Sequence, residues 1–281
     1  MGRRSRQERQ RRQQSATRRR ILAVAAVLAV GAIAAVALLR DRPAPMPISN
    51  AAPAVRPTLA LERPHDPSAF TQGLLLDGET LYESTGLYGE SSLRRVDLDS
   101  GAVLDSVRLG EAYFGEGLAA LGGRLYQLTW LEERVFVYDP ETLAPLDTLV
   151  VPGEAWGLAT DGDRLVLSDG SDRLRWVDPA TFATVREVRV RDGGRPVPQL
   201  NELEVIDGFV YANVWQSGSI AVIDPADGIV IQWLDLTELT RYHQSLGRDV
   251  LNGIAYDAAS GHLLVTGKLW PTLYAFDLPV R

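Results

Sequence analysis

Five copies of one short pattern recur along the chain, and this repetition constrains the fold more than any other feature. In each copy a Gly or Leu marks the start of an apolar strand-like segment. The marker positions are Gly73, Gly117, Gly157, Leu203 and Gly253. The intervals between them are 44, 40, 46 and 50 residues. Four-stranded propeller blades repeat about every 40–50 residues, so the spacing predicts an all-β, five-bladed β-propeller.

Each copy continues into further strand-like segments. The second segment is nearly the same in all copies, at residues 81–85, 125–129, 165–169, 210–214 and 263–267. A glycine-containing turn, such as Asp77-Gly78, precedes each of them and predicts a hairpin. A third segment ends in Asp, as in Tyr138-Asp139-Pro140, and in copies one to four a fourth strand follows.

The two ends of the repeat region predict how the ring closes. The fifth copy stops at residues 276–278 without a fourth strand, while residues 57–62 form a strand that belongs to no copy. We expect this N-terminal strand to complete the last blade, which removes an open sheet edge. Only one helix is expected, around residues 236–246.

The N-terminal region has its own composition. Residues 1–20 form a basic tail without apolar periodicity, and residues 21–39 contain nineteen consecutive apolar or small residues. About 20 such residues cross a bilayer, so we predict one transmembrane helix that serves as a signal-anchor. The alternative is a cleaved signal peptide with a long apolar region. Residues 40–56 are interpreted as an Ala/Pro-rich linker, and residues 57–281 as the propeller domain.

Charge distribution predicts the location of that domain. Nine Arg precede the apolar segment and only Arg40 and Arg42 closely follow it, which places the N-terminus in the cytoplasm and the body in the periplasm or outside the cell. If the anchor is cleaved, the domain is secreted. Residues 1–42 carry a net charge of +9. Since the whole chain carries −7, the remaining residues carry −16. An acidic body argues against nucleic-acid binding, and the absence of Cys excludes thiol chemistry and disulfides.

Polar and aromatic side chains beside the markers are expected to converge, because the first strand of every blade lines the central channel and ligands bind at its mouth. These residues are Gln72, Glu116, Trp156, Asn201 with Glu202, and Asn252. Trp130 and Trp215 each lie 14 residues after a member of this set. Lys268, the only Lys of the chain, occupies a similar place in the fifth copy.

Each candidate also has a structural interpretation. Glu116 could simply accept hydrogen bonds from channel amides, and the tryptophans could pack in the core. Gln72 and Asn201 could stabilise turns or bind channel water, and Lys268 could be an exposed charge. Their recurrence at shared blade positions favours a common site.

Several motifs resemble the plant and bacterial glutaminyl-peptide cyclotransferases, a family of five-bladed propellers. The motifs run in the family's order between about Pro64 and Phe276. They include Pro64-His65-Asp66-Pro67, Phe70-Thr71-Gln72-Gly73, Phe114-Gly115-Glu116-Gly117, Leu200-Asn201-Glu202 and Thr266-Gly267-Lys268. The resemblance implies that Glu116 is the catalytic acid/base. It also implies a substrate pocket made of Gln72, Trp130, Trp156, Asn201, Trp215 and Lys268.

The implied activity is an acyltransferase reaction that converts the N-terminal glutamine of a peptide or protein to pyroglutamate and releases ammonia. The residues suit it, because the substrate's own amine is the nucleophile and no cofactor is required. A structural divalent cation in the channel is compatible with the same interpretation. The expected partners are peptides with an N-terminal Gln and, through residues 21–39, the membrane. The uncleaved membrane segment departs from the family, because many members have a cleavable signal instead.

Two other functions stay open at this stage. The first is a non-enzymatic, membrane-anchored binding scaffold, since propellers host many functions. The second is a metal-dependent, lactonase-like hydrolase, for which Glu116, Asn201, Glu202 and Asn252 would supply a cation cage.

Overall fold

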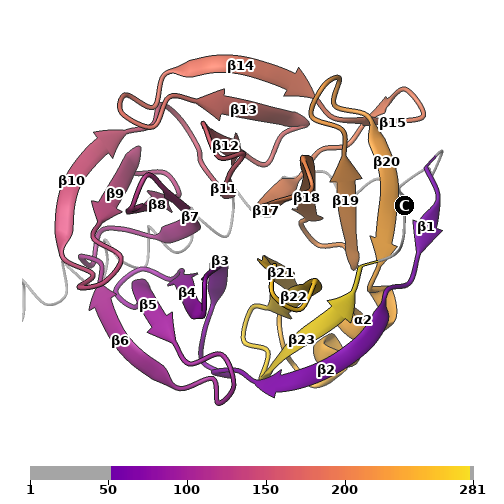
Figure 1. The fold of residues 1–281 in the computed structure, drawn as a ribbon, viewed down its shortest axis with the longest axis horizontal. Coiled ribbons are helices and arrows are strands. Elements are labelled where there is room, and N and C mark those ends of the chain that lie inside the picture. The colour runs from indigo at the N-terminus through magenta and orange to yellow at the C-terminus, as the bar shows by residue number, and fades with distance from the viewer. Residues whose placement is uncertain (1–51, 279–281) are drawn as a thin grey trace, which may run out of the picture. The chain divides into compact units, whose positions relative to one another are not determined.

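Five antiparallel sheets surround a central axis in the computed structural model, which describes residues 52–278 (Figure 1). Blade 1 contains β3 (Thr71–Asp77), β4 (Thr80–Thr85), β5 (Ser92–Val96) and β6 (Val103–Arg108). Blade 2 contains β7 (Gly115–Leu121), β8 (Arg124–Thr129), β9 (Arg134–Tyr138) and β10 (Pro145–Val150). Blade 3 contains β11 (Leu158–Thr160), β12 (Leu165–Ser168), β13 (Arg173–Val177) and β14 (Thr184–Arg189). The five-bladed propeller expected from the repeat is confirmed.

The remaining two blades include strands from the N-terminal side. Blade 4 contains β17 (Leu200–Ile206), β18 (Phe209–Val214), β19 (Ser219–Ile223) and β20 (Val230–Asp235), with β1 (Ala54–Val55) added in parallel outside β20. Blade 5 contains β21 (Leu251–Asp257), β22 (His262–Gly267), β23 (Thr272–Asp277) and, at its outer edge, β2 (Thr58–Pro64). Strand β2 runs antiparallel to β23, with Thr58 opposite Asp277 and Pro64 opposite Thr272.

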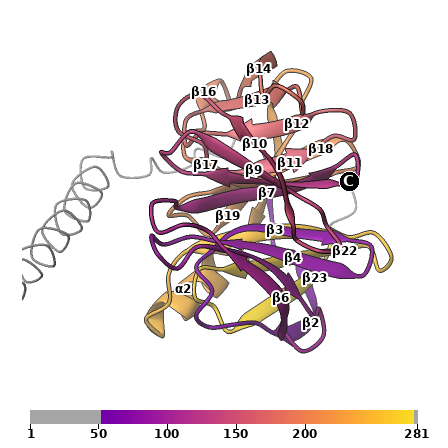
Figure 2. The same cartoon turned by 90° about the vertical axis from the view of Figure 1, so that its left-hand side faces the viewer.

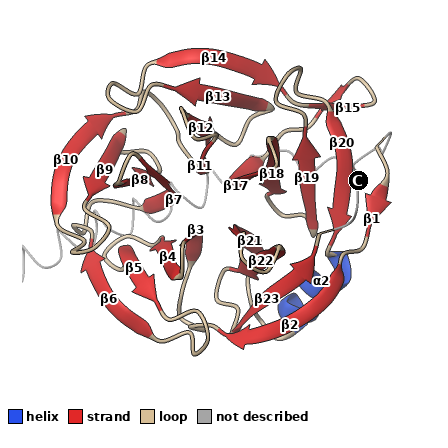
Figure 3. Ribbon diagram, in the orientation of Figure 1, coloured by secondary structure: helices blue, strands red, loops and turns tan. Residues whose placement is uncertain are grey.

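Strands make up almost all of the regular structure, as the view by element type and the side view make clear (Figures 2 and 3). The one α-helix among the described residues, α2 (Thr237–Ser245), lies where the sequence predicted it, beside β2 and β23 of blade 5. A short ribbon of β15 (Arg191–Asp192) and β16 (Arg195–Pro196) precedes blade 4.

In blades 1 to 4 the recurring Asp after the third strand stabilises the turn that follows. The Asp139 carboxylate accepts a hydrogen bond from the Thr142 amide at 2.9 Å, and Asp178 accepts one from the Thr181 amide at 3.1 Å. Such Asx turns satisfy amides that no strand can pair. The repeated Asp is therefore part of the blade and not of a binding site.

Each hydrophobic cluster lies between two neighbouring blades. For example, Leu81 of blade 1 packs in one cluster with Leu264 of blade 5, and Tyr82 of blade 1 packs with Leu125 of blade 2. The five clusters cover five blade-to-blade contacts, so both faces of every sheet are buried. Burial on both faces accounts for the nearly continuous apolar second strands.

The last residues of the expected linker 40–56 pair with blade 4. Ala54 and Val55 pair with Trp233 and Leu234 of β20, and the Ala52 amide donates to Asp192 at 2.9 Å. The outer strand of blade 4 has unpaired backbone groups, and β1 supplies partners for them. Residues 1–51, including the apolar segment 21–39, lie outside the described residues. Within residues 52–278 no helix has the length and hydrophobicity needed to cross a membrane.

Candidate functional site

The innermost strands place four predicted residues at equivalent points. Gln72, Glu116, Asn201 and Asn252 are each the second residue of β3, β7, β17 and β21, respectively, and these strands lie nearest the axis in Figure 1. In all four strands the pairing register shifts at this point, as between Thr71 and Gly73. A β-bulge turns a side chain away from the regular alternation and is common beside active sites. The repeated bulge therefore explains why a polar residue can stand here in an otherwise apolar strand.

The residues that follow the second strands form the outer part of the same site. Trp130, Trp215 and Lys268 directly follow β8, β18 and β22. Because the first two strands of a blade are antiparallel, the end of the second lies beside the start of the first. In blade 1 the corresponding residue is Gly86, where a Cβ atom would lie 2.4 Å from the Phe114 ring. The glycine thus leaves room for the Phe114 ring.

Glu116 is held by a chain of amide side chains. Gln72 Nε2 donates to Glu116 Oε1 at 2.8 Å, and Asn252 Nδ2 donates to Gln72 Oε1 at 3.2 Å. All three side chains are buried. The Ser84 hydroxyl also donates to the Glu116 main-chain carbonyl. The structure therefore brings together two of the predicted site residues, Gln72 and Glu116, and adds Asn252 as the support behind them.

The predicted tryptophans form a connected aromatic wall. Trp156 and Trp215 meet edge to face with ring centroids 5.6 Å apart, and Trp130 meets Phe114 in the same way at 5.6 Å. The indole N–H groups of Trp130 and Trp156 both donate to Oε1 of Glu154, at 2.6 and 2.9 Å. Edge-to-face pairs are a favoured aromatic geometry. The three rings thus belong to one structure and not to separate blade cores.

Lys268 is buried, so its interpretation as an exposed surface charge is wrong. Its Nζ lies 4.7 Å from the centroid of the Phe70 ring, a cation–π distance. Burial lowers the pKa of the Lys268 ammonium, and the negative charges of Glu116 and Asp249 oppose that shift. The lysine therefore shares the electrostatic environment of Glu116.

Asn201 is buried at the equivalent point of blade 4. Its main-chain carbonyl accepts a hydrogen bond from the Ser168 hydroxyl at 2.6 Å. Its side-chain Oδ1 has no hydrogen-bond partner within residues 52–278. An amide in this state is suited to contact a ligand.

Glu202 is fully buried among the innermost strands. The register makes Glu202, and not the expected Leu203, the equivalent of Gly73 and Gly253 in blades 1 and 5. Its two oxygens accept hydrogen bonds from the Ile254 amide at 2.7 Å and the Leu74 amide at 3.2 Å, so it links three blades. Burial raises the pKa of this carboxyl well above its usual value, and the two amides and Glu204 act on it more weakly.

The position of Glu202 weakens the hydrolase interpretation. Both of its oxygens bind backbone amides, and residues 52–278 contain no cluster of three or more His, Asp or Glu side chains suited to hold a metal ion. A cage of oxygen ligands, which a calcium-like ion needs, would have to compete with these bonds. The glutamate therefore has a structural explanation.

The Pro64-His65-Asp66-Pro67 motif is also structural. His65 Nδ1 lies 2.7 Å from the Trp270 carbonyl, and its Nε2 lies 3.1 Å from Glu83 Oε1. Burial alone would lower the pKa of His65, but the Glu83 carboxylate outweighs it and raises the pKa. The pair joins the segment before Phe70 to the segment after Lys268 and so positions two site residues.

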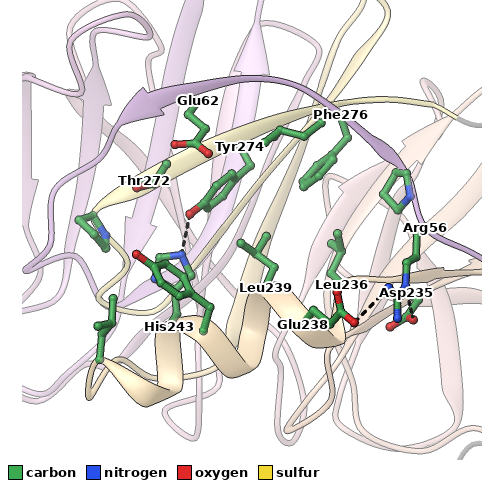
Figure 4. A pocket seen from close by; sticks show the side chains of 15 residues that line it. Arg56, Glu62, Asp235, Leu236, Glu238, Leu239, His243, Thr272, Tyr274 and Phe276 are labelled. Atoms are coloured by element: carbon green, nitrogen blue, oxygen red, sulfur yellow. Dashed lines mark hydrogen bonds and ion pairs between the residues drawn. The ribbon is translucent and has the colours of Figure 1, made fainter.

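A separate cavity of about 470 Å³ lies beneath α2, between that helix and strands β2 and β23 (Figure 4). His243, Tyr274 and Leu239 line it, and none of the seven predicted site residues does. A second cavity of about 450 Å³ runs along blade 1 and includes Phe70 and Gly86, so it borders the site.

Sequence reasoning missed three side chains of this region. Phe70 and Phe114 belong to the family motifs, which predict no role for them, and Glu154 belongs to none of the motifs. The one sequence signal for them was the glycine at position 86, which leaves space for the Phe114 ring. Nothing in the sequence connects Glu154 to Trp130, which lies in the preceding blade.

Fold and site together define a β-propeller with a buried cluster of polar and aromatic side chains at the start of its innermost strands. Ligands of propellers commonly bind at the central channel, which these strands line. A family model described as glutamine cyclotransferase matches residues 26–278. The chain is 50% identical over 222 residues to a glutaminyl-peptide cyclotransferase of Arabidopsis thaliana, which covers 77% of this chain and 69% of the relative. The chain belongs to the glutamine cyclotransferase family of enzymes.

A solved structure agrees with this assignment. The chain is 39% identical to the glutaminyl cyclase of Myxococcus xanthus, with a TM-score of 0.76 over 82% of this chain and 99% of the other. The family resemblance identified from the motifs is thereby confirmed.

Proposed function

We propose that this protein is a glutaminyl-peptide cyclotransferase that converts an N-terminal glutamine to pyroglutamate with release of ammonia. The observation that carries the proposal is the buried Glu116, held at 2.8 Å by Gln72 beside the tryptophan wall, in a chain of this family. A binding scaffold has no need of a buried carboxylate at that point. Desolvating a carboxylate is costly, and hydrogen bonds such as the one from Gln72 offset that cost.

The proposed reaction needs one proton carrier. The α-amine of the substrate attacks the carbon of its own side-chain amide, a C–N bond forms, and the original C–N bond to the leaving nitrogen breaks. Glu116 takes a proton from the attacking amine and delivers it to the departing nitrogen, so the carboxylate is regenerated. A shuttle of this kind contributes about 10²–10⁴-fold to the rate.

The aromatic wall would fold the substrate. Cyclisation requires the amine and the amide carbon to meet, and holding reacting groups in that geometry can be worth about 7–11 kcal/mol. Trp130, Trp156 and Trp215 supply rigid surfaces for this purpose. Loss of one of these tryptophans should therefore affect substrate orientation more than proton transfer.

The oxygen of the reacting amide becomes negative in the transition state, and buried donors would stabilise it. Gln72 Nε2 is already bonded to Glu116, so we assign Gln72 chiefly to holding the carboxylate. The Lys268 ammonium and the Asn201 amide are the better candidates for donors. Both side chains carry N–H donors and are buried, and the Lys268 ammonium interacts electrostatically with Glu116.

The test is direct. The purified full chain is incubated with a Gln-initiated peptide, with and without EDTA, and the peptide is followed by mass spectrometry. We expect a mass loss equal to one ammonia, unaffected by EDTA, and no change in a control peptide whose amine is acetylated. No mass loss would favour a scaffold, and activity abolished by EDTA would favour a metal-dependent enzyme.

We further propose that residues 21–39 anchor the protein in the membrane with the propeller on the periplasmic or extracellular side. The support is the apolar length of the segment and the Arg excess before it. Carbonate washing of membranes should leave the protein in the pellet, and protease added to spheroplasts should digest the propeller. Release by carbonate would indicate a cleaved or absent anchor.

Closure of the ring by β2 is a related proposal. The antiparallel register of β2 on β23 supports it, because blade 5 would otherwise have an exposed edge. Deletion through residue 64 should abolish cooperative unfolding, whereas deletion through residue 50 should preserve it. Equal unfolding curves for the two deletions would contradict this role.

A further inference from the structure

Glu154 occupies a special position between two blades. It stands in the loop from β10 of blade 2 to β11 of blade 3, and its Oε1 accepts hydrogen bonds from the indole of Trp130 at 2.6 Å and that of Trp156 at 2.9 Å. These two tryptophans come from different blades. One carboxylate oxygen therefore cross-links two walls of the proposed pocket.

The loop that carries Glu154 is itself well fixed. The Ala155 amide donates to the Trp130 carbonyl at 3.2 Å, and the Gly153 amide donates to the Glu133 carboxylate at 3.1 Å. Backbone bonds on both sides of the residue thus tie it to the segment after β8. A side chain held in this way can act as a rigid support, which a mobile surface glutamate cannot.

The Trp156 ring has a second support on its other side. A Cβ atom at Gly170 would lie 2.7 Å from this ring, so the indole lies directly against the glycine backbone. Trp215 contacts the same ring edge to face at 5.6 Å. The carboxylate at the indole N–H also restricts the rotation of the ring, and hydrogen bonds to a charged acceptor are about twice as strong as neutral ones.

We propose that Glu154 is a positioning residue that fixes the relative orientation of Trp130 and Trp156 before the substrate binds. This inference rests on the proposed cyclotransferase activity. Preorganised walls spare the substrate the cost of ordering them, so their loss weakens binding more than chemistry. Glu154 itself makes no contact with the reacting atoms in this proposal.

The test compares two variants in two backgrounds. In the wild-type background Glu154→Ala should lower kcat/KM about 10- to 100-fold, mainly through a higher KM, as expected for the loss of hydrogen bonds to a charged group. Glu154→Gln keeps an acceptor oxygen and should recover most of this loss. In a Trp130→Phe, Trp156→Phe background, which lacks both indole N–H groups, Glu154→Ala should change kcat/KM less than about 3-fold.

Two controls distinguish a failure of the positioning role from a failure of the proposed activity. Glu141→Ala removes an exposed carboxylate from the turn after β9, at the other end of the blade, and should leave both constants unchanged. Near-ultraviolet circular dichroism should report altered indole packing in Glu154→Ala whether or not the protein is active. Equal losses in both backgrounds, or an unaltered spectrum, would overturn the positioning role. An inactive wild-type protein with an altered variant spectrum would refute the proposed function but not the cross-link.

Discussion

Replacement of Glu116 by Gln tests the central step of the mechanism with little change in shape. Gln is isosteric with Glu, and its side-chain oxygen can still accept the hydrogen bond that Gln72 Nε2 donates at 2.8 Å. The main-chain bond from Ser84 is unaffected by the substitution. We therefore expect the free energy of unfolding to change by about 1 kcal/mol or less, the typical net value of one hydrogen bond.

The effect on catalysis should be much larger. A neutral amide cannot carry the proton from the attacking amine to the leaving nitrogen, so the general acid–base contribution of about 10²–10⁴ is lost. This range corresponds to about 2.7–5.5 kcal/mol of transition-state stabilisation. The loss should fall on kcat, because the tryptophan wall and the bound conformation of the substrate are retained.

Steady-state ammonia release from a Gln-initiated peptide measures both constants, and urea unfolding measures stability on the same preparations. A kcat within about 10-fold of wild type, in a protein of normal stability, would refute the assignment of Glu116 as the proton carrier. A large loss of stability would instead mean that Glu116 has the structural role of a channel acceptor.

Three further substitutions separate the pocket, the axis and the helix. Trp156→Ala should raise KM about 10-fold or more while kcat falls less, because burial of one aromatic surface is lost; unchanged kinetics would move the pocket elsewhere. Glu202→Gln should lower the free energy of unfolding by about 1–3 kcal/mol in urea titrations. The reason is that the amide nitrogen of Gln cannot accept a hydrogen bond from the Ile254 or the Leu74 amide, as a carboxylate oxygen does. The kcat per folded molecule should stay within a few-fold of wild type. Burial lowers the pKa of His243 to about 4, whereas a histidine in an unfolded chain has a pKa of about 6.5. Between about pH 4 and about pH 6.5 the unfolded state therefore binds more protons than the folded state. The free energy of unfolding should fall by about 1–3 kcal/mol as the pH drops from about 6.5 to about 4. His243→Phe should flatten this dependence, and an unchanged slope would show that another group causes it.

Periodicity in the sequence was sufficient to predict the blades. The repeated strands, the Gly turns, the Asp after each third strand and the single helix are local patterns, and each is found at the predicted place. A pattern with a fixed repeat also identifies equivalent residues, which is why Trp130, Trp215 and Lys268 could be matched before any coordinates. One register error occurred at Leu203, because a bulge hides the true equivalent, Glu202.

Contacts between blades could not be predicted in the same way. The repeat places Glu116, Gln72 and Asn252 at equivalent positions, but their order in the hydrogen-bond chain depends on which blades are neighbours and on the direction of each bulge. Glu154 shows the same limit, since it lies in the loop between blades 2 and 3 and binds a tryptophan of blade 2 that precedes it by 24 residues.

By itself, then, the sequence determined the number of blades, the strands within them and the set of residues near the axis, because all of these follow from local periodicity. Only the tertiary structure decided which of these residues touch. It buried Lys268 beside Phe70, assigned Glu202 to the axis and joined two tryptophans through one carboxylate. The physical reason is that close packing around the axis, and not chain order, sets the distances between side chains of different blades.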